Sequence, residues 1–283
     1  MFTAGNLILG SIAGLIVGAT AVSVPVLVLG RGQQATNSGG PTAPPVPSTL
    51  AAARAEYQRA LSAVRATSGF HYVATSTGPA NQRIVGDAGQ SSGRQDITVR
   101  SNFGAEEFTL LLLSGTVYFE GNVPALQDQL GVSAANALAL ASRWVSVSNG
   151  DGPYSVLQPG ITVGDQAGEM ALIPSTVTDA GAGKRRIEGS VPPQQGAPAG
   201  SGHIDVDSGN HRPVVYVSVI SANGVSLTSS TTFSKWDEAP SVTAPSGAVA
   251  WSTLGAIAPP GGYGGGGGGG GGVTPSPTPQ GTL

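Results

Sequence analysis

The side chains that could do chemistry in this sequence are few and dispersed. The chain has no cysteine, which excludes thiol nucleophiles, disulfides, iron–sulfur clusters and thiolate zinc sites. His71, His203 and His211 are scattered over candidate strands and turns, so they do not indicate a metal site. Glu106 and Glu107 are adjacent in a candidate strand, where neighbouring side chains point to opposite faces and cannot share a proton.

Two segments approach cofactor or metal motifs but lack required positions. Residues 181–184 (GAGK) resemble a P-loop fragment, yet no glycine stands five residues before Gly183 and Arg185 replaces the Ser/Thr. Residues 205–210 begin like a calcium loop, but Gly209 falls one position early and no glutamate stands at position twelve. The G-x-S-x-G pattern occurs once, at residues 89–93 (GQSSG), but it lies between two predicted strands and not between a strand and a helix, so it does not predict a nucleophile elbow. The sequence therefore predicts a hairpin loop at the first segment, a strand end and turn at the second, no cofactor, no metal and no enzymatic activity.

Charge also limits the class of partner. The 13 Lys and Arg residues and 16 Asp and Glu residues give a net charge of −3. Nucleic-acid binding depends on basic residues that neutralise phosphates, and this balance does not supply them. We therefore expect no nucleic-acid partner.

The amino-terminal segment predicts attachment to a membrane. Residues 7–29 contain no charged side chain, and a helix of this length spans roughly 34 Å, enough for a hydrocarbon core. We interpret residues 1–30 as a transmembrane or signal-anchor segment. A cleaved signal peptide is the alternative, since residues 19–21 (ATA) fit a cleavage site. Arg31 follows the span and weakly favours a cytoplasmic body.

Composition divides the rest of the chain into three parts. Residues 31–48 form a linker rich in proline and glycine, and residues 252–283 include nine consecutive glycines, which predicts a disordered tail. Residues 49–251 are long enough for one domain with a sizeable core.

Within that domain the apolar pattern predicts an α+β fold. Residues 49–66 have a helical apolar stripe. Two short helices are predicted at residues 122–130, with Pro124 in the first turn, and at residues 133–142, where Ser133 is the cap. Alternating or apolar runs bounded by turns predict the strands of one large antiparallel sheet. These runs are residues 70–74, 82–85, 95–100, 108–113, 116–120, 144–147, 170–173, 185–191, 204–206, 213–220 and 225–233. We expect Trp144 and Trp236 to be mostly buried at the ends of the sheet.

Several ordered motifs carry a family resemblance. They are VYFEGN at 117–122, RWVSV at 143–147, YSVL at 154–157, GNHRPV at 209–214 and TFSKWDE at 232–238. In this order and spacing they resemble the LppX/LprAFG-type envelope lipoproteins of actinobacteria, whose fold is similar to the LolA/LolB carriers. The resemblance implies a strongly curved half-barrel over helices, with acyl chains held between them. This chain departs from that family because Arg31 stands where a lipidated cysteine is expected, so the apolar segment itself would be the anchor.

On such a half-barrel every second residue of each strand faces inward. Those positions either line a hydrophobic cavity or fill a closed core, and aliphatic and aromatic residues suit both. The candidate ligand-binding residues are Phe70, Tyr72, Ile97, Val99, Phe108, Leu110, Leu112, Val117 and Phe119.

Two functions follow from this interpretation. The first is an extracytoplasmic binding or carrier protein for an acyl chain of a lipid or lipoglycan, attached to the cell membrane by a single span or secreted if that segment is cleaved. The second is an envelope sensor or interaction domain that binds a protein partner. A wide internal cavity favours the first function, and a filled core with an exposed apolar patch favours the second.

Overall fold

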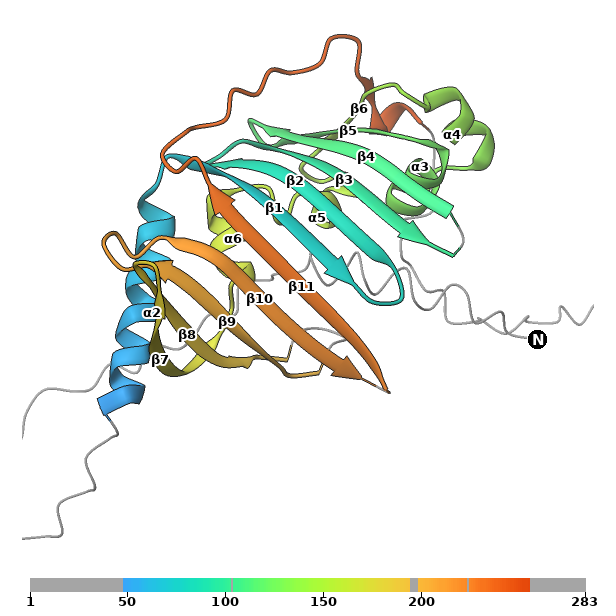
Figure 1. Cartoon of the computed structure of the whole chain (residues 1–283). Coiled ribbons are helices and arrows are strands. Elements are labelled where there is room, and N and C mark those ends of the chain that lie inside the picture. Colours follow the sequence, from blue (N-terminus) through green and yellow to red (C-terminus); the bar gives the residue numbers. More distant parts are fainter. Residues whose placement is uncertain (1–47, 103, 194–197, 223, 255–283) are drawn as a thin grey trace, which may run out of the picture.

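The computed structural model describes residues 48–254, except residues 103, 194–197 and 223 (Figure 1). The predicted anchor, almost all of the predicted linker, and the tail from residue 255 lie outside the described residues. Among the helices that are described, none is both long and apolar enough to cross a membrane.

The described domain is built on one sheet of twelve strands. In spatial order these are β12, β6, β5, β4, β3, β2, β1, β11, β10, β9, β8 and β7, and all neighbours are antiparallel except the pair β6–β12. The strands are β1 (Gly69–Thr77), β2 (Asn81–Gly89), β3 (Gly93–Ser101), β4 (Gly104–Leu113), β5 (Thr116–Gly121), β6 (Val145–Ser148), β7 (Ile173–Gly181), β8 (Lys184–Val191), β9 (Gly200–Asp207), β10 (Pro213–Ala222), β11 (Val225–Ser234) and β12 (Val249–Ala250). Two meanders, β1–β5 and β7–β11, thus meet where β1 pairs with β11.

The helices pack around this sheet at three places. They are α2 (Ser48–Ala66), α3 (Val123–Leu130), α4 (Ala134–Leu140), α5 (Tyr154–Leu157) and α6 (Val163–Glu169), followed near the end by a 3₁₀ turn at Trp251–Thr253. Helix α2 contacts β7 and β8, and α3 contacts β4 and β5. Figure 1 shows the sheet curving over α5 and α6. The predicted α+β class, with a large, mostly antiparallel sheet and few helices, is confirmed.

Capping side chains fix where the short helices begin. Asn122 and Ser133 accept backbone N–H groups at the starts of α3 and α4, as the sequence predicts. At the start of α6, Thr162 and Asp165 form a reciprocal capping box. Helices α5 and α6 and the parallel pair were not predicted. The predicted strand at residues 170–173 is wrong for residues 170–172, because α6 ends at Glu169 with Met170 as its C-cap and β7 begins only at Ile173.

The two near-motifs are turns, as expected. Residues 181–184 form the tight turn between β7 and β8. After β9, the Asp207 carboxylate accepts the backbone N–H groups of Gly209 and Asn210, which closes the turn that leads into β10. Both segments therefore connect strands.

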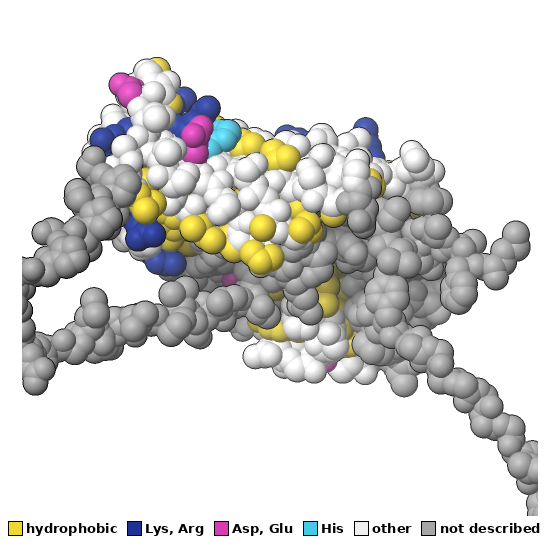
Figure 2. Space-filling view, turned by 90° about the horizontal axis from the view of Figure 1, so that it is seen from below, with side chains coloured by type: hydrophobic (Ala, Val, Ile, Leu, Met, Phe, Trp, Pro, Cys, Tyr) yellow, Lys and Arg dark blue, Asp and Glu magenta, His cyan; other side chains and the backbone are white. Residues whose placement is uncertain are grey.

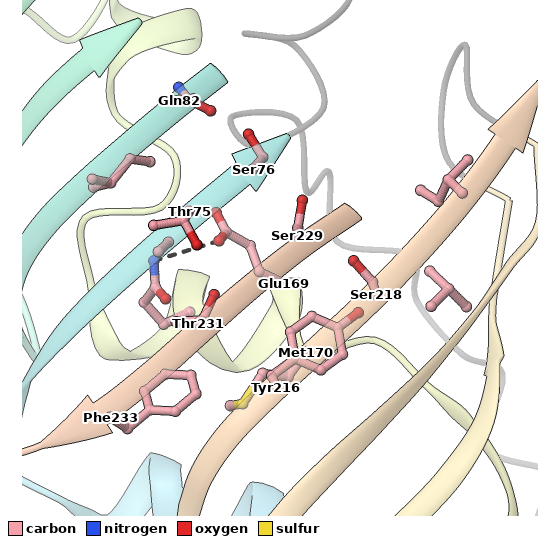
Figure 3. Close-up of a pocket in the computed structure, with 15 residues that line it drawn as sticks. Thr75, Ser76, Gln82, Glu169, Met170, Tyr216, Ser218, Ser229, Thr231 and Phe233 are labelled. Carbon is pink, nitrogen blue, oxygen red and sulfur yellow. Dashed lines mark hydrogen bonds between the residues drawn. The ribbon is translucent and has the colours of Figure 1, made fainter. Parts of the chain in front are cut away.

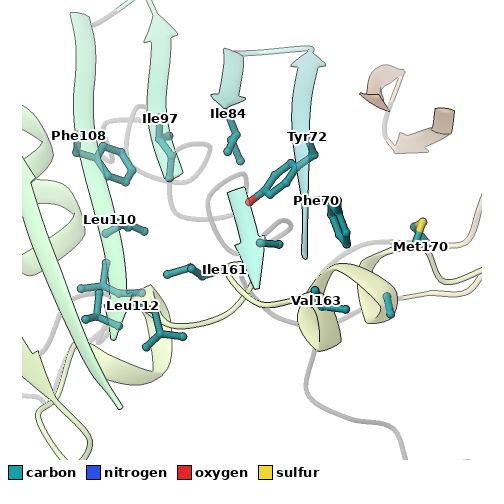
Figure 4. Packing of buried hydrophobic residues seen from close by; sticks show 14 of the residues in the cluster. Phe70, Tyr72, Ile84, Ile97, Phe108, Leu110, Leu112, Ile161, Val163 and Met170 are labelled. Carbon is teal, nitrogen blue, oxygen red and sulfur yellow. The ribbon is translucent and has the colours of Figure 1, made fainter. Parts of the chain in front are cut away.

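The core lies between the concave face of the sheet and the segment that contains α5 and α6. Figure 4 shows Phe70, Tyr72, Ile84 and Ile97 from the sheet facing Ile161 of that segment. Strand alternation produces this face, since inward residues of β3 are buried while Arg94 and Asp96 form an ion pair outside.

Candidate functional site

A cavity of about 70 Å³ lies on the concave side of the sheet, beside α6 (Figure 3). We call it the α6 cavity. Strands β1, β2, β8, β10 and β11 and the end of α6 contribute its residues. They are Ala74, Thr75, Ser76, Gln82, Ile84, Gln166, Glu169, Met170, Val191, Tyr216, Ser218, Ile220, Ser229, Thr231 and Phe233.

Three polar atoms in this cavity are buried and have no hydrogen-bond partner in the described part of the protein. They are Ser76 Oγ, Gln82 Oε1 and Glu169 Oε1. Ser76 is 3% exposed and Gln82 is 7% exposed. Buried polar groups in folded proteins are nearly always paired, because an unpaired one costs about 1–3 kcal/mol. No other side-chain atom among the described residues is buried in this way, so the unpaired groups gather in one place.

Glu169 brings a carboxyl group into the cavity. The residue is half-buried, but its Oε1 is shielded from solvent, and its Oε2 is 3.4 Å from Gln166 Nε2. Burial raises the pKa of Glu169 to about 8, and the negative charge of Asp165 contributes in the same direction. The carboxyl group is therefore mostly protonated at neutral pH and can donate a hydrogen bond.

The rest of the lining combines hydroxyl groups with apolar surface. Burial raises the pKa of Tyr216 to about 12, so its hydroxyl stays neutral. Further hydroxyl groups come from β1, β10 and β11, namely those of Thr75, Ser76, Ser218, Ser229 and Thr231. The apolar surface comes from Ile84, Met170, Val191, Ile220 and Phe233. The cavity therefore suits a ligand with an apolar part and a hydrogen-bonding part.

A buried polar network holds the segment before α6 in place. The carbonyl oxygen of Gly160 accepts hydrogen bonds from Tyr72 Oη at 3.1 Å and from Gln95 Nε2 and Gln166 Nε2, both at 2.7 Å. Gly160 has φ +83°, a conformation that glycine adopts without strain. Because Gln166 belongs to α6, the network ties this helix to β1 and β3, and so positions Glu169.

A second, smaller cavity of about 20 Å³ lies next to α5. We call it the α5 cavity. Its lining is Gln82, Ile84, Gln95, Ile97, Val99, Phe108, Leu110, Gln129, Val156, Leu157 and Pro159. Gln82 and Ile84 therefore line both cavities.

All nine residues that the sequence proposes as ligand-binding are buried, with exposure of 9% or less. Four of them line the α5 cavity, namely Ile97, Val99, Phe108 and Leu110. The other five, Phe70, Tyr72, Leu112, Val117 and Phe119, belong to the packed core and line neither cavity. None of the nine lines the α6 cavity, and whether any contacts a ligand stays a prediction.

The residues that distinguish the α6 cavity were missed from the sequence. Ser76 and Gln82 have inward parity, so alternation alone could have placed them beside Tyr72 and Ile84. Glu169 is the last residue of a short helix that was not predicted, and it shares a cavity with Ser76 only through the tertiary fold. Glu106 is buried and accepts a hydrogen bond from Gln129, whereas its neighbour Glu107 is exposed. The two side chains therefore point to opposite faces of the sheet, as predicted.

No protein-family model matches this chain, and no curated protein matches it either. Two solved structures are similar to it. One is LprF from Mycobacterium bovis, with 17% identity, a TM-score of 0.41, and coverage of 71% of this chain and 99% of that chain. The other is the lipoprotein LppX of Mycobacterium tuberculosis, with 15% identity, a TM-score of 0.41, and coverage of 68% and 99%. Both names fall within the group that the ordered motifs resemble.

Proposed function

We propose that this chain is an extracytoplasmic, membrane-anchored binding or carrier protein for the acyl chain of a lipid or lipoglycan, and that the α6 cavity is where the ligand is held. The observation that carries the proposal is that the three unpaired buried side-chain polar atoms of the described residues gather in one cavity, together with apolar side chains. A ligand with an apolar chain and one polar junction would satisfy both features.

The two parts of the lining would act differently. Each methylene buried against residues such as Met170, Ile220 and Phe233 contributes about 0.8 kcal/mol. Ser76 and the protonated Glu169 would fix the orientation of the polar junction by donating hydrogen bonds to it. An ester, amide or hydroxyl group next to the acyl chain meets this pattern.

The size of the cavity limits how much of the ligand it encloses. Sites that enclose a drug-sized molecule measure roughly 300–1,000 Å³, whereas this cavity measures about 70 Å³. We therefore propose that it encloses only a short segment of the ligand. The polar junction and the rest of the ligand would lie at the mouth, near the half-buried Ser229.

The amino-terminal segment would set the location. An uncleaved span at residues 7–29 followed by a polar linker would hold the domain close to the lipid surface from which it takes its ligand.

A blocking variant tests the proposal. Ser229 lies inward on β11 and lines the cavity, so Ser229→Trp should fill the mouth. Thr228 is the exposed neighbour on the same strand, and Thr228→Trp is the matched control. We expect Ser229→Trp to weaken uptake of a fluorescent sixteen-carbon fatty acid at least tenfold, and Thr228→Trp to bind like the wild type. Equal binding by both folded variants would refute this placement of the ligand.

A second candidate function is the binding of a protein partner. It is favoured by the filled interior, in which the two cavities measure about 70 and 20 Å³. Large apolar side chains are also exposed on α4, β7 and β11, namely Leu138 at 70%, Ile173 at 56% and Val225 at 49%. A wild-type chain that binds no fatty acid would favour this function over the carrier.

A further inference from the structure

The α6 and α5 cavities lie on either side of one strand. Gln82 and Ile84, both inward residues of β2, are the two residues that line both cavities. The register explains this position, because Gln82 pairs with Ser76 of β1 on one side and with Val99 of β3 on the other. Ser76 lines the α6 cavity and Val99 lines the α5 cavity.

The next inward pair repeats the arrangement. Ile84 pairs with Ala74 of β1, which lines the α6 cavity, and with Ile97 of β3, which lines the α5 cavity. The side chains of Gln82 and Ile84 thus separate the α6 cavity from the α5 cavity. We call these two side chains the ridge.

Of the two ridge residues, Gln82 is the one that can move or be shortened at little cost. Ile84 is β-branched, so its χ1 is restricted, and it is 3% exposed among core residues. Gln82 has a flexible side chain, and its Oε1 has no hydrogen bond to lose when the amide turns. An amide in this place is also unusual, since its neighbours across the α5 cavity are mainly apolar, including Val99, Phe108 and Leu110.

We propose that Gln82 is a specificity-determining residue that sets how much of an acyl chain the domain encloses. This inference rests on the proposed function. A chain that enters the α6 cavity ends against the Gln82 side chain, and the apolar α5 cavity beyond it stays closed. The α5 cavity would then accept the end of a longer acyl chain only when the side chain at residue 82 is shorter than that of glutamine.

Shortening the side chain gives the test. Gln82→Ala removes Cγ and the amide group, four non-hydrogen atoms, and so connects the two cavities. Room for about four atoms allows about two to four further methylenes, and each buried methylene changes affinity about fourfold. The measurement is displacement of a fluorescent fatty acid from the full chain, held in an amphipathic polymer, by saturated fatty acids of twelve to twenty carbons, with a protein-free polymer blank.

We expect the chain length that binds best to increase by two to four carbons in Gln82→Ala. Gln82→Met keeps the length of the side chain and should keep the wild-type optimum, although it changes polarity. Arg83→Ala truncates the exposed neighbour on the outer face of β2 and should also keep it. A purely structural role of Gln82 would change affinity for all lengths together, without moving the optimum.

The outcomes separate this inference from the proposed function. If the wild type binds fatty acids and a folded Gln82→Ala variant shows the wild-type optimum, the role of Gln82 is refuted while the carrier function stands. If the wild type binds no chain of any length, the proposed function itself fails. Should Gln82→Ala not fold in a thermal melt, Gln82→Ser, which is smaller than Gln and keeps a polar atom, gives the same comparison.

Discussion

Replacing Glu169 by glutamine should change how the stability of the domain depends on pH. Burial raises the pKa of Glu169 in the folded state to about 8, from an ordinary value of 4.5. Below pH 4.5 the group is protonated in both states and contributes nothing to the difference. As pH rises from 4.5 to about 8, the unfolded chain loses this proton while the folded chain keeps it, so the folded state loses relative stability.

The structure gives the size of this loss. The interval from 4.5 to about 8, at about 1.36 kcal/mol per pH unit, corresponds to a full effect of about 5 kcal/mol. Water that enters through the mouth of the cavity reduces it, so this figure is an upper limit. Glu169→Gln keeps the shape and cannot ionise, and its free energy of unfolding should therefore exceed that of the wild type by a margin that grows with pH.

The assay is urea unfolding of the wild type, Glu169→Gln and Ser76→Ala at intervals from pH 5 to pH 8.5. Between these limits we expect the margin of Glu169→Gln over the wild type to grow by at least about 2 kcal/mol. Ser76→Ala alters the same cavity without removing a titratable group, so its difference from the wild type should stay constant. A margin for Glu169→Gln that changes by less than about 0.5 kcal/mol would refute the buried, protonated carboxyl.

Two further predictions concern the packing that supports the cavity. Glu56 is fully buried and contacts Arg59, Arg185 and His211 at 2.6–2.9 Å. Glu56→Ala should lower the free energy of unfolding by about 2 kcal/mol in urea, because it removes hydrogen bonds between charged groups and leaves only partly exposed cations behind. Arg59→Ala should lower it by less than about 1 kcal/mol, because Arg59 is half exposed. Burial alone would raise the pKa of Glu56, but hydrogen bonds and charges from Arg59 and His211 outweigh it and lower the pKa, so its contribution should be present above pH 4.5 and lost in acid. Trp236 is partly exposed and packs on Phe70 with ring centroids 4.8 Å apart, so Trp236→Ala should cost about 2 kcal/mol; a loss near zero would show that this ring cluster does not support the sheet.

Local patterns were enough to predict most of the elements of this domain. The alternation of β3, the turns after β7 and β9, and the caps at Asn122 and Ser133 depend on neighbouring residues, and all are present. The same alternation predicted which face of each strand is buried, and it placed the nine candidate residues inside the domain. Helices α5 and α6 were missed because their four and seven residues carry too little periodicity to identify a helix. Helix α4 is also seven residues long, but its cap at Ser133 indicated where it begins.

Only the tertiary structure decided where the unpaired polar groups meet. Ser76 and Gln82 are inward strand residues, but they line one cavity with Glu169 because the Gly160 network holds α6 under β1 and β3. The ridge at Gln82 likewise depends on the register of β1, β2 and β3, which joins residues far from one another in the chain. Periodicity determines whether a side chain points inward, because it is a property of the backbone of one strand. Whether that side chain contacts a core residue or lines a cavity depends on the segment that packs against it. The sequence of the strand alone does not determine which segment that is.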